Sequence, residues 1–140
     1  MKRIVFTFLI VLLLSSCATA TSQPASELTV EMNDFSFLPA ELTVSAGKPV
    51  QMTITNVGNV EHDFVIEKID VSFVSVEGSG VGAHHTSGEH VEYDLHVSTS
   101  VNGTSVLTFT PNEPGTYKIF CSVEGHEVAG MVGELIVVPQ

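Results

Sequence analysis

Basic residues are scarce in this chain, which has five Lys and Arg against 16 Asp and Glu and a formal net charge of −11. A nucleic-acid-binding protein needs Lys and Arg side chains against the phosphates, so the composition excludes that class. A strongly acidic surface instead favours a partner with a basic face and fast, salt-sensitive encounters. The alternative is that the charge serves only solubility, and the sequence alone does not separate the two.

Long hydrophobic runs are also few, and the one at the start of the chain is too short to span a membrane. Residues 4–14 are apolar apart from Thr7 and follow the basic Lys2 and Arg3, whereas a membrane-spanning helix needs about 20 apolar residues. A basic head, a run of this length and small residues before a cleavage site are typical of an export signal. We therefore predict a signal peptide over residues 1–16.

The end of this signal, Leu14-Ser15-Ser16-Cys17, resembles a bacterial lipobox, in which the cysteine becomes the lipidated first residue. The motif predicts lipidation of Cys17 and an anchor on the outer face of the cell membrane, or its periplasmic side, rather than a span across it. Ordinary cleavage nearby, without lipid, is the alternative. Residues 17–26, rich in Thr, Ser and Ala, would form a flexible tether, and residues 27–140 one domain. Loss of the leader would leave three basic residues against 16 acidic ones, a net charge of −13.

Cysteine is nearly absent: the chain has only Cys17 and Cys121. If Cys17 carries a lipid, Cys121 has no disulfide partner in the chain, although free thiols are unusual in an oxidising compartment. Three states remain for Cys121, namely a buried inert thiol, an intermolecular disulfide and a metal ligand. Its sequence neighbours have to decide between them.

No segment has a sustained helical period, and no internal repeat is visible. Apolar and polar residues alternate instead, and turn signals such as Ala46-Gly47-Lys48-Pro49 and Pro114-Gly115 separate the alternating segments. This pattern predicts an all-β fold, a single antiparallel β-sandwich, with Met32 and Met52 in its core. The expected strands include residues 28–32, 50–55, 91–98, 117–121 and a closing strand at 133–138.

A Gly- and Ser-rich segment at residues 77–90 does not fit a compact sandwich, and we predict a surface loop or insertion there. It contains His84, His85 and His90. Histidine-rich tracts bind copper or zinc, so these three residues and His96 are candidates for a second, exposed metal site. The alternative is a solvated loop, since no fixed ligand spacing is present.

Cys121, His126 and Met131 follow one another as C-x4-H-x4-M just before the predicted last strand. The loop between them can bring the imidazole and the thioether back to the cysteine, and His62 at the end of another predicted strand adds a second imidazole. Two imidazoles, a thiolate and a long axial thioether suit copper, whereas structural zinc sites rarely use a thioether. The competing interpretation is a buried Cys, a core Met and an unrelated loop His.

Several motifs resemble those of the cupredoxins, especially auracyanin-, plastocyanin- and azurin-type proteins, over about Glu27 to Val138. They are Gly115-Thr116-Tyr117, Phe120-Cys121-Ser122, Gly125-His126, Gly130-Met131 and Gly133-Glu134-Leu135, with a weaker part at residues 37–39 and 42–47. The resemblance implies a Greek-key sandwich with one type 1 copper ion. His62, Cys121 and His126 would be the strong ligands and Met131 the weak axial one. It further implies electron transfer through the exposed edge of His126, beside the apolar Val128 and Ala129.

The chain departs from this family at the residue after the first histidine, where Asp63 stands in place of the common Asn, with Ser122 opposite. Neighbours of metal ligands tune the metal. We hypothesise that an ionised Asp63 beside the copper favours Cu(II) and lowers the reduction potential. A solvent-facing Asp63 is the alternative.

The resemblance and the ligand set favour a monomeric electron carrier that is not an enzyme and exchanges electrons with cytochromes or membrane redox complexes. A second hypothesis is a copper-binding or delivery protein outside the cell membrane, which the histidine-rich segment and the lipid anchor suit. Such a delivery site is expected to use Met and His without a thiolate, so Cys121 favours the carrier. A copper oxidase or nitrite reductase would need a second domain and further copper ligands that the sequence does not show.

Overall fold

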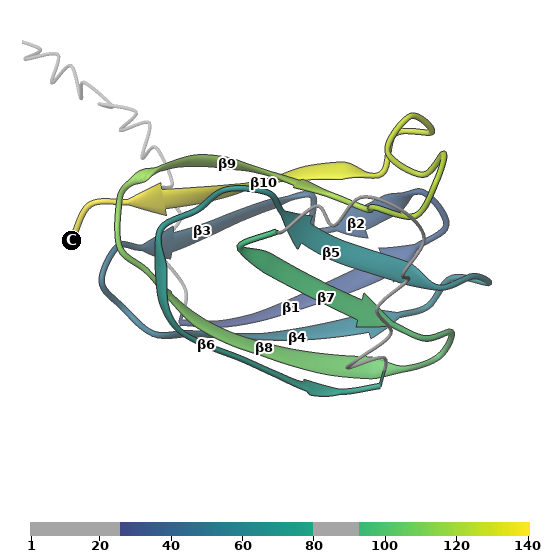
Figure 1. Ribbon diagram of the computed structural model, residues 1–140, viewed down its shortest axis with the longest axis horizontal. Coiled ribbons are helices and arrows are strands. Elements are labelled where there is room, and N and C mark those ends of the chain that lie inside the picture. The colour runs from purple at the N-terminus through teal and green to yellow at the C-terminus, as the bar shows by residue number, and fades with distance from the viewer. Residues whose placement is uncertain (1–25, 80–92) are drawn as a thin grey trace, which may run out of the picture.

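The computed structural model describes residues 26–79 and 93–140 as two β-sheets packed face to face (Figure 1). The predicted all-β sandwich is therefore confirmed. Neither described range contains a helix, so neither offers one that is long and apolar enough to cross a membrane. The strands are β1 (Glu27–Asn33), β2 (Ser36–Leu38), β3 (Glu41–Ser45), β4 (Val50–Asn56), β5 (His62–Ile66), β6 (Val71–Gly78), β7 (Leu95–Thr99), β8 (Thr104–Pro111), β9 (Gly115–Phe120) and β10 (Val132–Val138).

One sheet has the strand order β2-β1-β4-β8-β6 and the other the order β3-β10-β9-β5-β7. Most neighbours are antiparallel, as predicted, but β1 pairs with β4 in parallel and β3 pairs with β10 in parallel. The expectation of a purely antiparallel sandwich is wrong at these two places. Alternation identifies the buried face of a strand, and it carries no information on the direction of the neighbouring strand.

The core lies between the sheets and follows the alternation in the sequence. On β4, Met52 and Ile54 are fully buried while Gln51 faces solvent, and Met32 on β1 is also fully buried. The exception is β5, in which all five residues are buried. This strand lies inside its sheet between β9 and β7. It begins with His62, so its complete burial holds that histidine within the sandwich.

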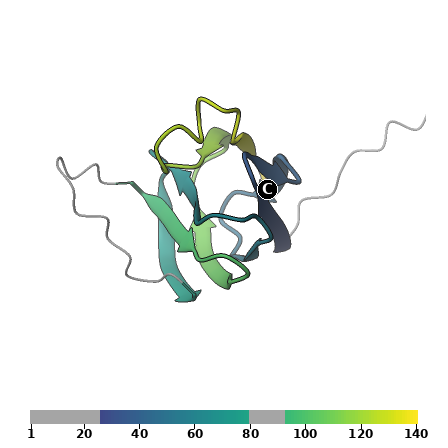
Figure 2. The same ribbon diagram turned by 90° about the vertical axis from the view of Figure 1, so that its right-hand side faces the viewer.

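Four connections meet at one end of the sandwich, at the right of Figure 1 and facing the viewer in Figure 2. They are the turn from β1 to β2, the loop from β4 to β5, the turn from β7 to β8 and the long loop from β9 to β10. The C-terminus and the start of β1 lie at the opposite end (Figure 1).

Several predicted features fall partly or wholly outside the described residues. The signal peptide at 1–16, the lipidated Cys17 and the tether up to residue 25 are among them, as are His84, His85 and His90. At the edges of the predicted insertion, Glu77 and Gly78 belong to β6. The strand predicted at 91–98 corresponds to β7, which begins at Leu95.

Candidate metal centre

The four predicted ligands come together at the loop end of the sandwich. His62 opens β5, Cys121 directly follows β9, and His126 and Met131 lie in the β9–β10 loop. His62, Cys121 and Met131 are at most 1% exposed, and His126 is 9% exposed. Because β5 and β9 are neighbours in one sheet, residues 59 positions apart in the chain meet at the loop end of these strands.

Three donor atoms converge at this point. The Nδ1 atoms of His62 and His126 are 3.2 Å apart, and the Sγ atom of Cys121 lies 3.4 Å from Nδ1 of His126 and 4.0 Å from Nδ1 of His62. Both imidazoles thus present the same ring nitrogen to the thiol. A set of two nitrogens and one sulfur, buried and mutually close, is a trigonal donor arrangement.

The β9–β10 loop is held by hydrogen bonds of its own backbone. The Cys121 amide donates to the Met131 carbonyl (3.2 Å), and the Met131 amide donates to the His126 carbonyl (3.0 Å). Gly130 has a φ of 105°, a left-handed conformation that favours glycine. These bonds fix Cys121, His126 and Met131 relative to one another before any partner or ion is considered.

Burial shifts the pKa of two of the donors, Cys121 and His126. Burial raises the pKa of the Cys121 thiol, against the opposing effect of a hydrogen bond from the Asp63 amide to Sγ (3.3 Å). Burial also lowers the pKa of His126, and the nearby positive charge of a protonated His62 lowers it further. A cation that binds here therefore displaces the thiol proton, and its affinity must rise with pH while the thiol is still protonated.

Asp63 is 4% exposed and faces inward rather than toward solvent. Its Oδ2 atom accepts a hydrogen bond from Ser122 Oγ and lies 3.4 Å from Nε2 of His96 on β7. Burial alone would raise the pKa of Asp63, but these contacts with His96 and Ser122 outweigh it and hold the pKa below the usual value. Its Oδ1 atom has no hydrogen-bond partner among the described residues. Asp63 thus connects β5, the ligand loop and β7.

Two residues of the β1–β2 turn reach the site without having been predicted. The Oδ1 atom of Asp34 lies 3.3 Å from Nε2 of His62, and the ring of Phe35 packs edge-on against His126 at a centroid distance of 5.1 Å. Neither residue belongs to a periodic pattern or to a spaced motif. The sequence could have identified them only together with the knowledge that this turn and the β9–β10 loop lie at the same end of the sandwich.

Of the other histidines, His96 is the one within the described residues, and it is not part of this cluster. The His96 side chain is 39% exposed, and its Nε2 atom contacts Oδ2 of Asp63 at 3.4 Å. His84, His85 and His90 lie outside the described residues, so the second metal site stays a prediction.

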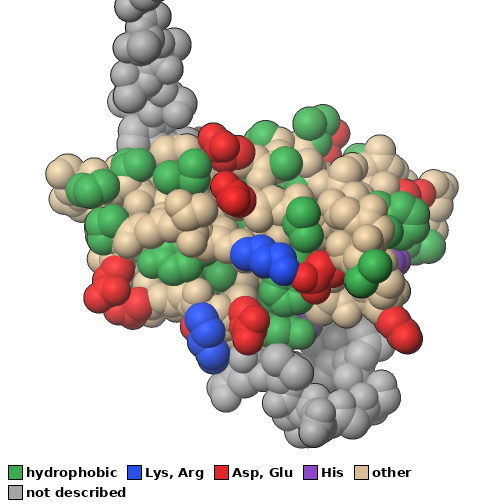
Figure 3. Space-filling view, turned by 90° about the horizontal axis from the view of Figure 1, so that it is seen from above, with side chains coloured by type: hydrophobic (Ala, Val, Ile, Leu, Met, Phe, Trp, Pro, Cys, Tyr) green, Lys and Arg blue, Asp and Glu red, His purple; other side chains and the backbone are tan. Residues whose placement is uncertain are grey.

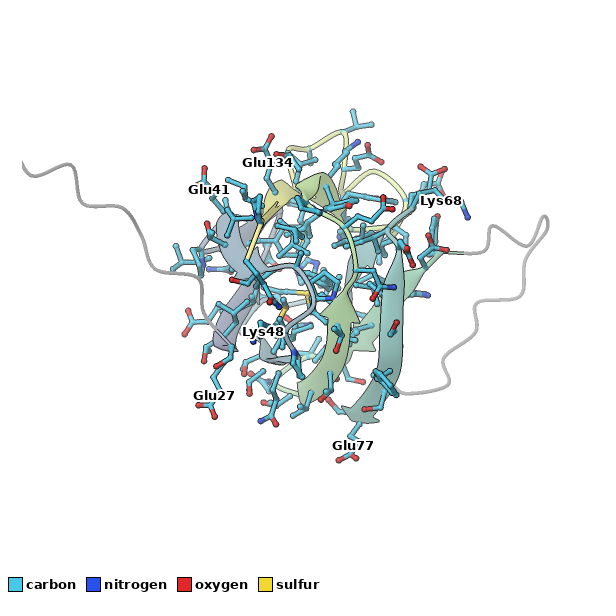
Figure 4. The ribbon with its side chains drawn as sticks, turned by 90° about the vertical axis from the view of Figure 1, so that its left-hand side faces the viewer. Glu27, Glu41, Lys48, Lys68, Glu77 and Glu134 are labelled. Atoms are coloured by element: carbon cyan, nitrogen blue, oxygen red, sulfur yellow. The ribbon has the colours of Figure 1, made fainter. Side chains whose placement is uncertain are left out.

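Apolar side chains surround the cluster at the surface, and histidine surface borders hydrophobic side chains at this end in Figure 3. The exposed hydrophobic residues of the four connections at this end are Phe35, Val57, Val60, Val101 and Val128, of which Val128 is 94% exposed. Acidic side chains point outward from both sheets, as Figure 4 shows for Glu27, Glu41, Glu77 and Glu134. The loop end therefore combines a buried donor cluster with an apolar rim.

Comparison with known proteins places these features in context. The family described as a cupredoxin-like domain matches residues 5–137. The copper-resistant cuproprotein CopI of Rubrivivax gelatinosus is 29% identical over 101 residues, which are 72% of this chain and 59% of that protein. The chain thus spans less than two thirds of the length of that relative.

Among solved structures, a dithionite-reduced auracyanin from Roseiflexus castenholzii has a TM-score of 0.65 at 21% identity, covering 84% of this chain and all of the other. Auracyanin A, a blue copper protein from Chloroflexus aurantiacus, has a TM-score of 0.55 at 25% identity, covering 80% and 99%. A multicopper oxidase from Campylobacter jejuni shares the fold over 31% of its length, with 87% of this chain covered, a TM-score of 0.60 and 14% identity. The fold by itself therefore occurs both in a blue copper protein and in a multicopper oxidase.

Proposed function

Because this chain belongs to the cupredoxin-like family, we propose that it is a type 1 blue copper protein that carries single electrons between redox partners. The cofactor is copper. The observation that carries the proposal is the buried cluster of two Nδ1 atoms and one Sγ atom, 3.2 to 4.0 Å apart, with Met131 hydrogen-bonded to both neighbouring ligands.

The donor chemistry fits this ion. His62, Cys121 and His126 would hold it, and Met131 would add a weak thioether ligand. When bound, copper takes up and releases one electron, with sulfur donors favouring Cu(I) and imidazoles favouring Cu(II). The protein's contribution would be rigidity and the exclusion of water. All four residues are buried, and backbone hydrogen bonds of the loop hold Cys121, His126 and Met131 relative to one another.

The apolar rim supports a route for electron exchange through the exposed edge of the His126 ring. This residue is the most exposed of the four, Phe35 packs against its ring, and Val128, two positions further along the same loop, is almost fully exposed. Apolar patches of this kind are typical of docking sites for partner proteins. Cytochromes or membrane redox complexes are the partners we propose, and in this role the protein is not an enzyme.

We also propose that the protein is anchored outside the cell membrane. The leader at 1–16, a lipid on Cys17 and a tether over 17–26 would place a monomeric domain on the outer face of the cell membrane. Mass spectrometry of the protein recovered from membranes tests this, because a lipidated chain would begin at Cys17 with the added acyl mass.

A second candidate function is the holding and delivery of copper outside the membrane, which the similarity to a copper-resistant cuproprotein favours. The buried thiol argues for the carrier. A deprotonated Cys121 between two imidazoles would hold Cu(II) and Cu(I) in one rigid geometry, whereas delivery requires ready release of the ion.

Absorption and EPR spectra of the chain from Thr19 onward, loaded with Cu(II), separate the two functions. We expect an intense visible charge-transfer band with narrow copper hyperfine splitting, lost in Cys121→Ala and on reduction, and kept in the control His96→Ala. A pale protein whose ordinary Cu(II) spectrum survives loss of Cys121 would contradict the carrier and move the metal to other histidines.

A further inference from the structure

Asp34 contacts the side of the His62 ring that faces away from the donor cluster. Nδ1 of His62 lies near Cys121 and His126, while Nε2 of the same ring lies 3.3 Å from Oδ1 of Asp34. The ring is therefore held between the cluster on one side and a carboxylate of the β1–β2 turn on the other.

The carboxylate of Asp34 is itself fixed in place. Asn59 donates to it twice, from its backbone amide to Oδ1 (2.9 Å) and from its side-chain Nδ2 to Oδ2 (2.6 Å). Both oxygens of the carboxylate thus act as acceptors toward Asn59, and the same Oδ1 atom faces Nε2 of His62 at 3.3 Å. A carboxylate oxygen that accepts pairs with a ring N–H, so Nε2 of His62 is the donor in their contact.

Gly58 gives independent support, because the contact depends on the absence of a side chain there. A Cβ atom at position 58 would lie 2.5 Å from Oδ1 of Asp34 and 2.8 Å from Nε2 of His62. Both distances are shorter than any relaxed structure tolerates. The backbone of the β4–β5 loop thus leaves room for the carboxylate to reach the imidazole.

We propose that Asp34 is a positioning residue for His62: its carboxylate accepts the Nε2 proton, fixes the ring orientation and leaves Nδ1 unprotonated toward the donor cluster. The His62 Nδ1 atom then accepts from Nδ1 of His126, 3.2 Å away, in the metal-free protein. Carboxylate–histidine pairs of this kind raise the basicity of a metal-binding imidazole. This inference rests on the proposed copper site, at which Asp34 would favour Cu(II) over Cu(I).

The first test needs no copper. Nitrogen-15 NMR of the histidine rings in the metal-free protein should find His62 with its proton on Nε2 and protected from exchange with water. Asp34→Ala should lose that protection, and Asp34→Asn should keep it, since an amide oxygen still accepts. A proton on Nδ1 of His62 in the unchanged protein, or equal protection in Asp34→Ala, would overturn the proposal even if copper binds as expected.

The second test measures Cu(II) affinity and reduction potential in the copper-loaded protein. Asp34→Ala should bind Cu(II) about 10–100-fold more weakly, and each tenfold loss that Cu(I) does not share raises the potential by about 59 mV. The control Glu124→Gln removes one charge from an exposed position of the ligand loop, and Asp34→Asn should lie between this control and Asp34→Ala. Equal potentials for Asp34→Ala and Glu124→Gln would overturn the proposal.

Absence of a type 1 spectrum in the unchanged protein would instead reject the proposed function and leave the NMR result to decide on Asp34.

Discussion

Asp63 is the residue at which this chain differs from the common cupredoxin pattern, and its surroundings keep it charged. It is buried beside His62, accepts from Ser122 and contacts His96, while its other oxygen has no partner among the described residues. A carboxylate in such a place interacts with the metal centre across protein rather than water, so its charge is poorly screened.

We expect Asp63→Asn to raise the reduction potential by tens of millivolts, because a neutral amide no longer favours the more positive Cu(II) state. A tenfold change in relative affinity corresponds to about 59 mV. Protein-film voltammetry measures the change, and Asp70→Asn, at an exposed carboxylate beyond the other end of β5, is the matched control. An unchanged potential in Asp63→Asn would reject the hypothesis for Asp63 and leave the ligand set untouched.

At the scale of single residues, the sequence predicted the donor residues of the site better than the residues that contact them. Cys121, His126 and Met131 lie close together in the chain, so their spacing alone placed them in one loop. Asp34 could not be predicted in this way, because its contact with His62 depends on two loops that are distant in sequence and on the missing side chain of Gly58.

Among the elements, β5 positions the site. It carries His62 at its first position and is buried along its whole length, with Phe64 packed edge-on against Phe37 at a centroid distance of 5.9 Å. Because β5 lies between β9 and β7, loss of its packing would loosen the strand that holds His62 against Cys121.

Phe64→Ala should lower the free energy of unfolding of the metal-free protein by about 3–5 kcal/mol, the usual cost of removing a buried phenylalanine. The control is the same substitution at Phe73 on β6, which is 87% exposed and should change stability by less than about 0.5 kcal/mol. Urea unfolding followed by circular dichroism measures both. Similar losses for the two variants would mean that burial at β5 does not stabilise the sandwich.

Alternation in the sequence located five of the strands, β1, β4, β7, β9 and β10, and their buried faces, as Met32, Met52 and the closing strand illustrate. It did not predict that β1 joins β4, and β3 joins β10, in parallel. Strand direction follows from the way in which the chain crosses between sheets, and that depends on packing of the whole sandwich rather than on any local pattern.

Over the whole molecule, the excess of acidic residues should govern how fast small redox reagents react. With 16 acidic residues in the chain against five basic ones, reduction by a hexaammineruthenium(II) cation should slow as ionic strength rises, and oxidation by the ferricyanide anion should accelerate. Stopped-flow absorbance at increasing salt measures both rates, and we expect changes of several-fold. Trends of the same sign for the two reagents would show that the charge does not act at the exchange surface.

The sandwich has two distinct poles. The first strand begins at Glu27, at the end away from the four connecting loops, while the donor cluster lies at the loop end (Figure 1). An attachment made through residues before Glu27 would therefore join the domain at the end opposite the donor cluster and leave the surface beside that cluster uncovered. For the electron carrier proposed above, the length of such an attachment would set which partners come within range and would leave the chemistry of the centre unchanged.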